Sequence, residues 1–140
     1  MLKYWILAAR PKTLTAALIP VLTATALAYS EGKGAWLPAL LCCLFAAIMQ
    51  IAANFINDLF DYKKGTDRED RLGPKRACAQ GWISPKAMQR GIIITLALAC
   101  VIGCCLLPFG GWALIGIGVA CVVFAFLYTT LLSYMGCGDL

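Results

Sequence analysis

Three long stretches of the chain contain no Asp, Glu, Lys or Arg: Thr13–Ser30, Gly34–Asn57 and Gly91–Gly138. A helix that crosses the hydrocarbon core of a membrane needs roughly 20 apolar residues. The first two stretches are therefore long enough for one span each, and the third is long enough for two. The segment Pro108–Gly111 favours a reversal of direction inside the third stretch. The pattern predicts four membrane-spanning helices, at about 13–30, 36–60, 90–107 and 112–134, with a loop at 61–89.

The composition supports the same class of protein. Of the 140 residues, 61% are hydrophobic and 14% are charged, whereas a soluble domain has about 45–50% apolar and about 25% charged residues. A chain this short buries only part of its surface, so a core cannot hide the excess. The chain also has no histidine and no C-x-x-C pair among its eight cysteines, which argues against a zinc site. We expect an all-α integral membrane protein.

The basic residues predict the orientation in the membrane. Lys33 is the one basic residue on one side of the predicted spans. The other side carries Lys3, Arg10, Lys12, Lys63, Lys64, Arg68, Arg71, Lys75, Arg76, Lys86 and Arg90. Lys and Arg accumulate on the cytoplasmic side of membrane proteins. The 61–89 loop and both termini are therefore expected in the cytoplasm.

Polar side chains recur at spacings of three and four near the end of the second predicted span. They are Gln50, Asn54, Asn57, Asp58 and Asp61. At about 100° per residue they fall within an arc of roughly 100° on one side of a helix. Carboxylates at membrane depth are costly and normally face a cavity or a partner. This face is expected to line a water-filled pocket at the cytoplasmic end.

The oxygen-bearing side chains of this face suit a magnesium ion that carries a polyphosphate. Mg²⁺ commonly takes one or two carboxylates together with substrate phosphates. Asp58 and Asp61, three residues apart, can share such a cation, and Asp67 could add a third carboxylate or an indirect contact. The following basic residues can hold the remaining phosphate oxygens. They are Arg68, Arg71, Lys75 and Arg76.

Two simpler explanations compete with a metal site. Polar and basic residues at a membrane boundary can be solvated or can contact anionic head groups, which explains each basic residue equally well when it is taken singly. Boundary solvation, however, has no reason to place five polar residues on one face. A calcium-binding loop after Asp61 fails because Gly65 is misplaced and Lys63 occupies a ligand position.

Five segments, in order, resemble motifs of the UbiA superfamily of membrane prenyltransferases, and within it the 1,4-dihydroxy-2-naphthoate prenyltransferases of menaquinone synthesis. The segments are Ala9–Leu14, Asn57–Asp67, Asp70–Arg76, Tyr128–Thr129 and Gly136–Leu140. The second resembles the first aspartate-rich motif of the superfamily, and the third resembles its diphosphate-contacting loop. The chain departs at Gly65, where many members have a third aspartate; Asp67 is the nearest substitute.

This resemblance implies Mg²⁺-dependent transfer of a polyprenyl group from its diphosphate to 1,4-dihydroxy-2-naphthoate, with loss of carbon dioxide, in a bacterial inner membrane. The implied catalytic residues are Asn57, Asp58 and Asp61, which with Asp67 would be the metal ligands. Contacts to the diphosphate are implied for Lys75, Arg76, Arg68 and Arg71, with Asn54 in the cavity. Membrane lipid is a further expected partner, and nucleic acid is not.

The resemblance covers about half of the family's fold, which has about nine helices and a second aspartate-rich motif. We therefore expect a truncated fragment whose half-site is poorly active. The alternative function is that of a small non-catalytic polytopic membrane protein, such as a subunit of a complex or a cation pathway. The basic segment 68–76 argues against a cation pathway because it would repel cations. The long signature of membrane alcohol phosphotransferases, a third class, is absent from the sequence.

Overall fold

The computed structural model describes residues 1–65 and 75–132, and the regular elements within them are helices. Four helical segments are long and apolar enough to cross a membrane, which confirms the predicted all-α membrane fold class. A short helix precedes them, and a π-helical turn follows the last. The elements are α1 (Leu2–Ala9), α2 (Pro11–Ser30), α3 (Trp36–Lys64), α4 (Pro85–Gly110), α5 (Ala113–Leu127) and η1 (Tyr128–Leu132).

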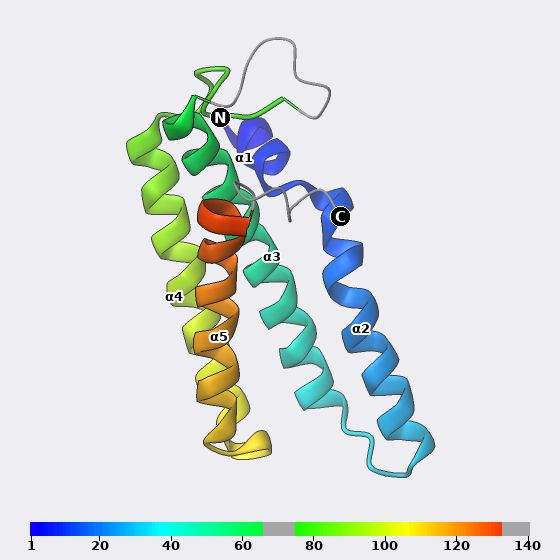
Figure 1. The fold of residues 1–140 in the computed structure, drawn as a ribbon. Coiled ribbons are helices and arrows are strands. Elements are labelled where there is room, and N and C mark those ends of the chain that lie inside the picture. The colour runs from blue at the N-terminus through cyan, green and yellow to red at the C-terminus, as the bar shows by residue number, and fades with distance from the viewer. Residues whose placement is uncertain (66–74, 133–140) are drawn as a thin grey trace.

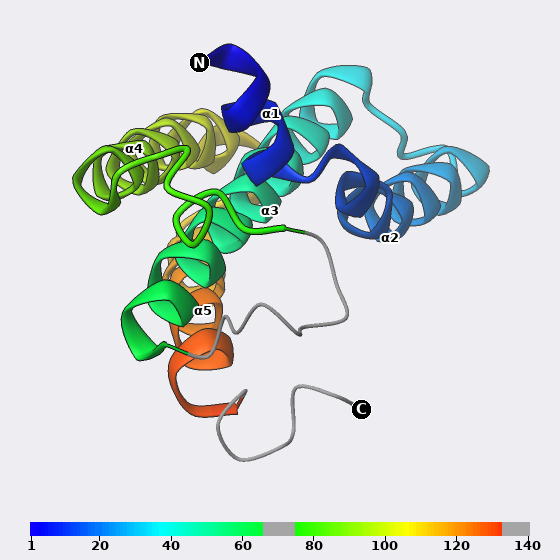
Figure 2. The same cartoon turned by 90° about the horizontal axis from the view of Figure 1, so that it is seen from above.

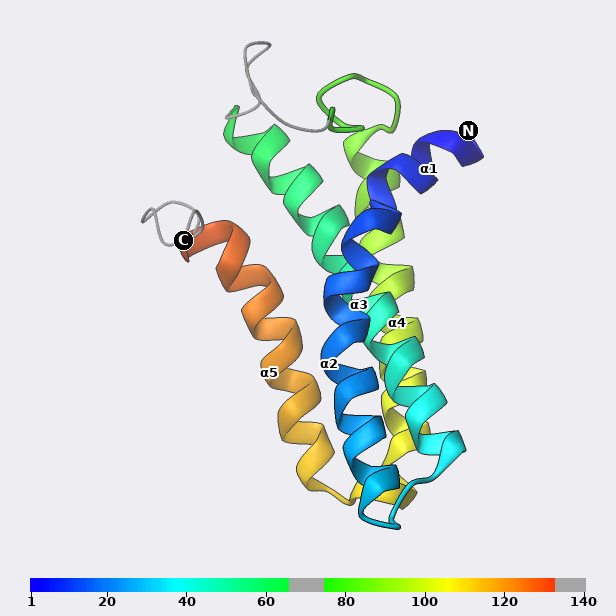
Figure 3. The same ribbon diagram turned by 90° about the vertical axis from the view of Figure 1, so that its right-hand side faces the viewer.

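Helix α3 is the central element of the bundle (Figure 2), and each of the other helices packs against it. Figures 1 and 3 show that α1, the C-terminal end of α3, residues 75–84 and η1 all lie at the same end. We call this the charged end, because nine of the Lys and Arg side chains in the described residues belong to its elements or to the adjacent ends of α2 and α4. The α2–α3 and α4–α5 connections lie at the opposite end, near Lys33.

The first span begins with a break that the sequence pattern did not predict. Arg10 has a left-handed backbone conformation, with φ 50° and ψ 69°, and separates α1 from α2. Pro11 then occupies the first turn of α2, where its missing N–H costs nothing and its fixed φ suits a helix. The Thr13 hydroxyl donates to the Arg10 carbonyl at 2.9 Å, which satisfies an acceptor at the break.

The predicted 61–89 loop was too long, because helices continue beyond the apolar stretches. Helix α3 runs to Lys64 and ends at Gly65, whose φ of 66° is the left-handed conformation typical of a helix C-terminus. Helix α4 begins at Pro85, and the preceding Ser84 accepts a hydrogen bond from the Ala87 N–H as an N-cap. Loss of hydrophobicity marks where a span leaves the lipid, not where its helix ends.

The reversal in the third apolar stretch also differs from the prediction. Helix α4 continues through Pro108 to Gly110, and the chain turns at Gly111, where φ is 73°. A proline removes one hydrogen bond from a helix, and in the last turn this loss does not stop it. The Gly111 N–H still donates to the Leu107 carbonyl at 2.8 Å.

The closely packed core lies at the charged end, where α1, α3, α4 and residues 75–84 meet. Its buried members are Ala8, Phe55, Ile56, Leu59, Ala77, Cys78, Ile83, Met88 and Ile92. Two aromatic pairs extend it: Tyr4 stacks on Trp82 with ring centroids 5.0 Å apart, and Trp5 meets Phe55 edge-on at 5.4 Å. The remaining lengths of the spans expose large apolar side chains, as expected of helices solvated by lipid.

Gly91 allows α1 to pack on α4, and this contact predicts the effect of a larger side chain. A Cβ atom at Gly91 would lie 2.7 Å from the Trp5 ring. We expect Gly91→Val to destabilise the protein by about 1–3 kcal/mol through overpacking, measured by thermal unfolding in detergent. Gly116→Val is the matched control, because a Cβ atom there meets nothing within 4 Å. Equal losses of stability in the two variants would contradict the prediction.

Candidate functional site

Asn54 connects the polar face of α3 to the break between α1 and α2. Its Nδ2 donates to the Ala9 carbonyl at 2.8 Å and to the Thr13 hydroxyl at 2.9 Å. The side chain is buried, so these bonds satisfy donors that water does not reach. Asn54 therefore fixes the position of the N-terminal end of α2 relative to α3.

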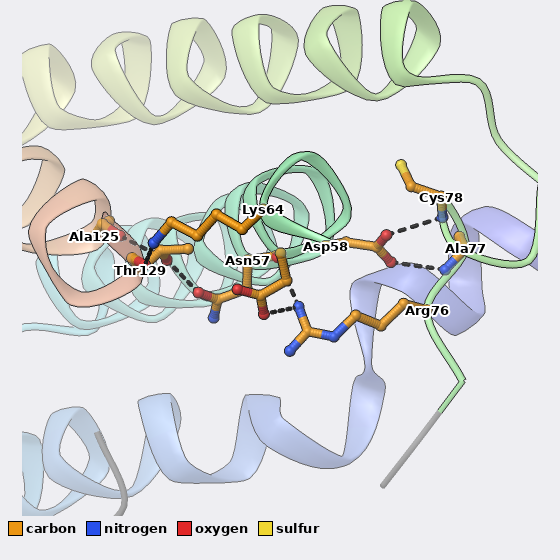
Figure 4. Close-up of polar contacts among 9 residues, drawn as sticks. Asn57, Asp58, Lys64, Arg76, Ala77, Cys78, Ala125 and Thr129 are labelled. Carbon is orange, nitrogen blue, oxygen red and sulfur yellow. Dashed lines mark hydrogen bonds and ion pairs between the residues drawn. The ribbon is translucent and has the colours of Figure 1, made fainter. Parts of the chain in front are cut away.

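Asn57 faces η1, the turn that follows α5, and accepts a hydrogen bond from it. The Thr129 hydroxyl donates to Asn57 Oδ1 (Figure 4). Lys64 strengthens the same junction, because its Nζ donates to the carbonyls of Thr129 and Thr130 at 2.8 and 3.2 Å. An amide oxygen has two lone pairs, so Asn57 Oδ1 retains the capacity to bind a cation.

Asp58 points to a different neighbour from Asn57 (Figure 4). Its Oδ2 accepts from the Ala77 N–H at 2.8 Å, and its Oδ1 accepts from the Cys78 N–H at 2.9 Å. The residue is 1% exposed. Both carboxylate oxygens are thus engaged with the main chain of the segment that leads into α4.

Asp61 pairs with a buried arginine. The Arg76 guanidinium contacts the Asp61 carboxylate, and the two side chains are only 7% and 12% exposed. Nη1 of Arg76 also donates to the Asn57 main-chain carbonyl at 2.6 Å. Arg76 therefore joins Asp61 to the backbone of Asn57, one helical turn earlier.

Helix geometry explains how these residues are sorted. Consecutive residues are about 100° apart around a helix, whereas residues four apart are separated by only about 40°. Asn57 and Asp61 therefore share one side of α3. Asp58 lies at the other edge of the polar face, toward residues 75–84. The structure brings together Asn57, Asp61 and Arg76, whereas the Asp58 carboxylate binds main-chain N–H groups of the 75–84 segment.

A cavity of about 430 Å³ adjoins this polar face. It is lined by Gln50, Ala53, Asn54, Asn57, Ala125 and Tyr128. The cavity lies between α3 and α5, and its lining combines the amides of α3 with alanine side chains from both helices. A polar group held near Asn57 would therefore have an apolar surface beside it.

The basic residues expected to contact phosphate are only partly within the described chain. Arg76 is buried beside Asp61, and the neighbouring Lys75 is exposed. The predictions for Asp67, Arg68 and Arg71 fall outside the described residues, as does the Gly136–Leu140 motif.

The described donors suit a magnesium ion that is bound together with a phosphate. Across residues 1–65 and 75–132, no three His, Cys, Asp or Glu side chains are grouped to hold a metal. Asn57 and Asp61 offer one amide oxygen and one carboxylate on the same side of α3. Mg²⁺ usually retains several waters and combines one or two carboxylates with substrate phosphates. The set fits such a shared cation, and it does not fit a cation enclosed by protein alone.

Sequence reasoning did not identify two residues of this site, Lys64 and Thr129, by their role. Lys64 lies seven residues after Asn57, about two turns on, so helical periodicity places it on the same side of α3. Thr129 stands in a Tyr-Thr-Thr sequence at the end of the last apolar stretch. Its hydroxyl and the carbonyls of the η1 turn meet α3 only through the packing of α5, which no local pattern reveals.

The comparisons with known proteins converge on one family. A 1,4-dihydroxy-2-naphthoate octaprenyltransferase of Haemophilus influenzae is 35% identical to the chain, with 99% of this chain and 49% of that protein covered. The enzyme of the same name from Escherichia coli is 36% identical, with 97% and 47% covered. UbiA prenyltransferase domain-containing protein 1 of Xenopus tropicalis is 30% identical over 73% of the chain. No solved structure matches the chain.

The chain thus spans about half the length of the two bacterial relatives. The model of the UbiA prenyltransferase family matches residues 17–140, which include the polar end of α3, α4 and α5. This match confirms the family to which the order of motifs pointed: the chain is an integral membrane protein that belongs to the UbiA prenyltransferase family.

Proposed function

We propose that this protein acts in the Mg²⁺-dependent transfer of a polyprenyl group from its diphosphate to 1,4-dihydroxy-2-naphthoate, a step of menaquinone synthesis. The observation that carries the proposal is the grouping of Asn57, Asp61 and Arg76, of which Asn57 also lines the α3–α5 cavity. Two oxygen donors and a guanidinium match a cation that shares a diphosphate. The names of the bacterial relatives supply the acceptor and the kind of group transferred.

In the proposed reaction, the bond between the allylic carbon and the diphosphate oxygen breaks, and the electron pair leaves with diphosphate. The ring carbon that bears the carboxylate forms the new carbon–carbon bond. Carbon dioxide then departs, and the electron pair of its bond returns to the ring. A bound Mg²⁺ would neutralise the charge that develops on the diphosphate.

Residues of the chain would bind the cation, the diphosphate and the prenyl tail. Asn57 Oδ1 and the Asp61 carboxylate would hold the cation, and Arg76 would contact phosphate oxygens, for which its planar fork is suited. The exposed Lys75 would add a second positive charge. Asp67, Arg68 and Arg71 remain predictions for the same diphosphate. The exposed apolar faces of the helices, in contact with membrane lipid, would receive the prenyl tail.

The charge distribution supports an orientation for the proposal. The charged end carries nine of the basic side chains in the described residues, and Lys33 pairs with Glu31 at the other end. By the positive-inside rule, we place the charged end in the cytoplasm of a bacterial cell, where the substrates would enter.

The proposal is tested by assaying membranes that contain the protein with geranyl diphosphate, 1,4-dihydroxy-2-naphthoate and Mg²⁺. We expect a prenylated product that extracts into organic solvent, with release of diphosphate, and no product when the metal is chelated. Mg²⁺-dependent binding of geranyl diphosphate would itself argue against the non-catalytic alternative, which uses the acidic face for ions without a diphosphate. Absence of both binding and transfer would contradict the proposed function.

A further inference from the structure

Residues 75–84 form a compact turn at the charged end, and this turn carries Arg76. The turn is closed by main-chain hydrogen bonds, from Gln80 to Arg76 at 3.0 Å and from Trp82 to Ala77 at 3.0 Å. Trp82 stacks on Tyr4 of α1. The position of the Arg76 guanidinium therefore depends on where this whole turn is held.

Asp58 is the residue of α3 that receives the turn. It accepts the two successive N–H groups of Ala77 and Cys78, one on each carboxylate oxygen. Successive main-chain N–H groups form a concave site for an anion, and here the anion is a side chain of the protein. The first of these two N–H groups belongs to Ala77, the residue directly after Arg76.

The surroundings of Asp58 oppose its use as a metal ligand. The residue is 1% exposed and lies among the buried apolar side chains of the charged end. Each Asp58 oxygen keeps a lone pair beside its hydrogen bond, but the residue is enclosed by protein, so a cation there would have to lose its waters. Mg²⁺ dehydrates reluctantly and favours sites that leave it several waters.

We propose that Asp58 is a positioning residue that fastens the 75–84 turn to α3 and so delivers Arg76 to Asp61 and the diphosphate, instead of binding the metal. This inference rests on the proposed function only for the ligand of Arg76; the fastening itself does not depend on it. The two aspartates would then have different roles. Asp61 would bind the cation, and Asp58 would position Arg76 to contact the diphosphate.

Hydrogen exchange of the chain in lipid nanodiscs tests the fastening without any substrate. We expect the Ala77 and Cys78 amides of the wild-type protein to exchange at least about 100-fold more slowly than in an unstructured peptide. In Asp58→Asn, an amide nitrogen would face a donor, so protection should fall about tenfold or more. Unstructured exchange rates at both wild-type amides would overturn the proposal, even if the variant does not accumulate.

Binding of geranyl diphosphate in nanodiscs tests whether Asp58 acts through Arg76. Asp58→Asn and Arg76→Ala should each weaken binding about tenfold or more, and the double variant should be no weaker than Arg76→Ala, because coupled residues are not additive. The Mg²⁺ concentration for half-maximal binding should stay unchanged in Asp58→Asn.

Other results distinguish the positioning role of Asp58 from the proposed function of the protein. Additive losses, or a raised Mg²⁺ requirement in Asp58→Asn with unchanged amide protection, would overturn the positioning role and return Asp58 to the metal. If the wild-type chain binds no geranyl diphosphate at any Mg²⁺ concentration, the proposed function fails, and the exchange rates alone decide whether Asp58 fastens the turn.

Discussion

Asp61→Asn is expected to weaken Mg²⁺-dependent binding of geranyl diphosphate by about 100-fold or more, since even residues that only support a metal ligand contribute 10–100-fold. The substitution keeps the side-chain volume and removes the charge that lies one turn from Asn57. Isothermal titration of the chain in nanodiscs, at several Mg²⁺ concentrations, measures the effect. Asp61→Ala should lose prenyl transfer as well, with the protein still inserted in the membrane.

The control for this prediction removes a carboxylate far from the site. Glu31→Gln changes the same charge at the opposite end of the bundle, where Glu31 lies 3.9 Å from Lys33 in an exposed pair. Exposed pairs contribute little to stability, so this variant should bind and insert as the wild type does. Wild-type binding or turnover by the Asp61 variants would remove Asp61 from the metal site.

Arg76→Ala is expected to affect stability and binding together. The Arg76–Asp61 pair is largely buried, and removing one partner of a buried pair typically costs about 3–5 kcal/mol. The variant also loses the hydrogen bond to the Asn57 carbonyl. We expect a lower unfolding temperature in detergent and binding of geranyl diphosphate weaker by about tenfold or more, as for other charge-assisted contacts.

Two further variants identify why Arg76→Ala lowers stability and weakens binding. Lys86→Ala removes one positive charge from an exposed position at the start of α4, and it should leave both measurements near the wild-type values. Arg76→Lys keeps the charge but not the planar fork, so it should restore part of the stability and less of the binding. Equal effects of Arg76→Ala and Lys86→Ala would show that only net charge matters.

Hydropathy was sufficient to predict the number of spans, and the spacing of polar residues predicted the face of α3 that carries the candidate site. Apolar stretches follow the thickness of the lipid, which is why four spans were foreseen. Helix ends follow capping groups, and the signals were present: Gly65 after α3, and Ser84 followed by Pro85 before α4. Pro11 is the corresponding signal for the break at Arg10, because helices usually end at or before the residue that precedes a proline.

The sequence predicted which residues of α3 belong to the candidate site, but not which partners each of them contacts. Periodicity gathered Asn57, Asp58 and Asp61 into one arc, yet an arc of roughly 100° faces more than one neighbour in a bundle. The contacts of Asp58 depend on a turn some twenty residues later in the chain, and those of Asn57 depend on Thr129. Such long-range partners are decided by tertiary packing, which a pattern within one helix does not contain.

In the proposed site, a divalent cation and a diphosphate bind together at Asn57 and Asp61. Mn²⁺ substituted for Mg²⁺ in nanodiscs broadens nearby NMR signals, so the Asn57 side-chain amide reports the position of the metal directly. We predict strong broadening of this signal when Mn²⁺ and geranyl diphosphate are present together, with the indole signal of Trp112 at the opposite end unaffected. Tight binding of both ligands with a sharp Asn57 signal would contradict a metal site at Asn57 and Asp61.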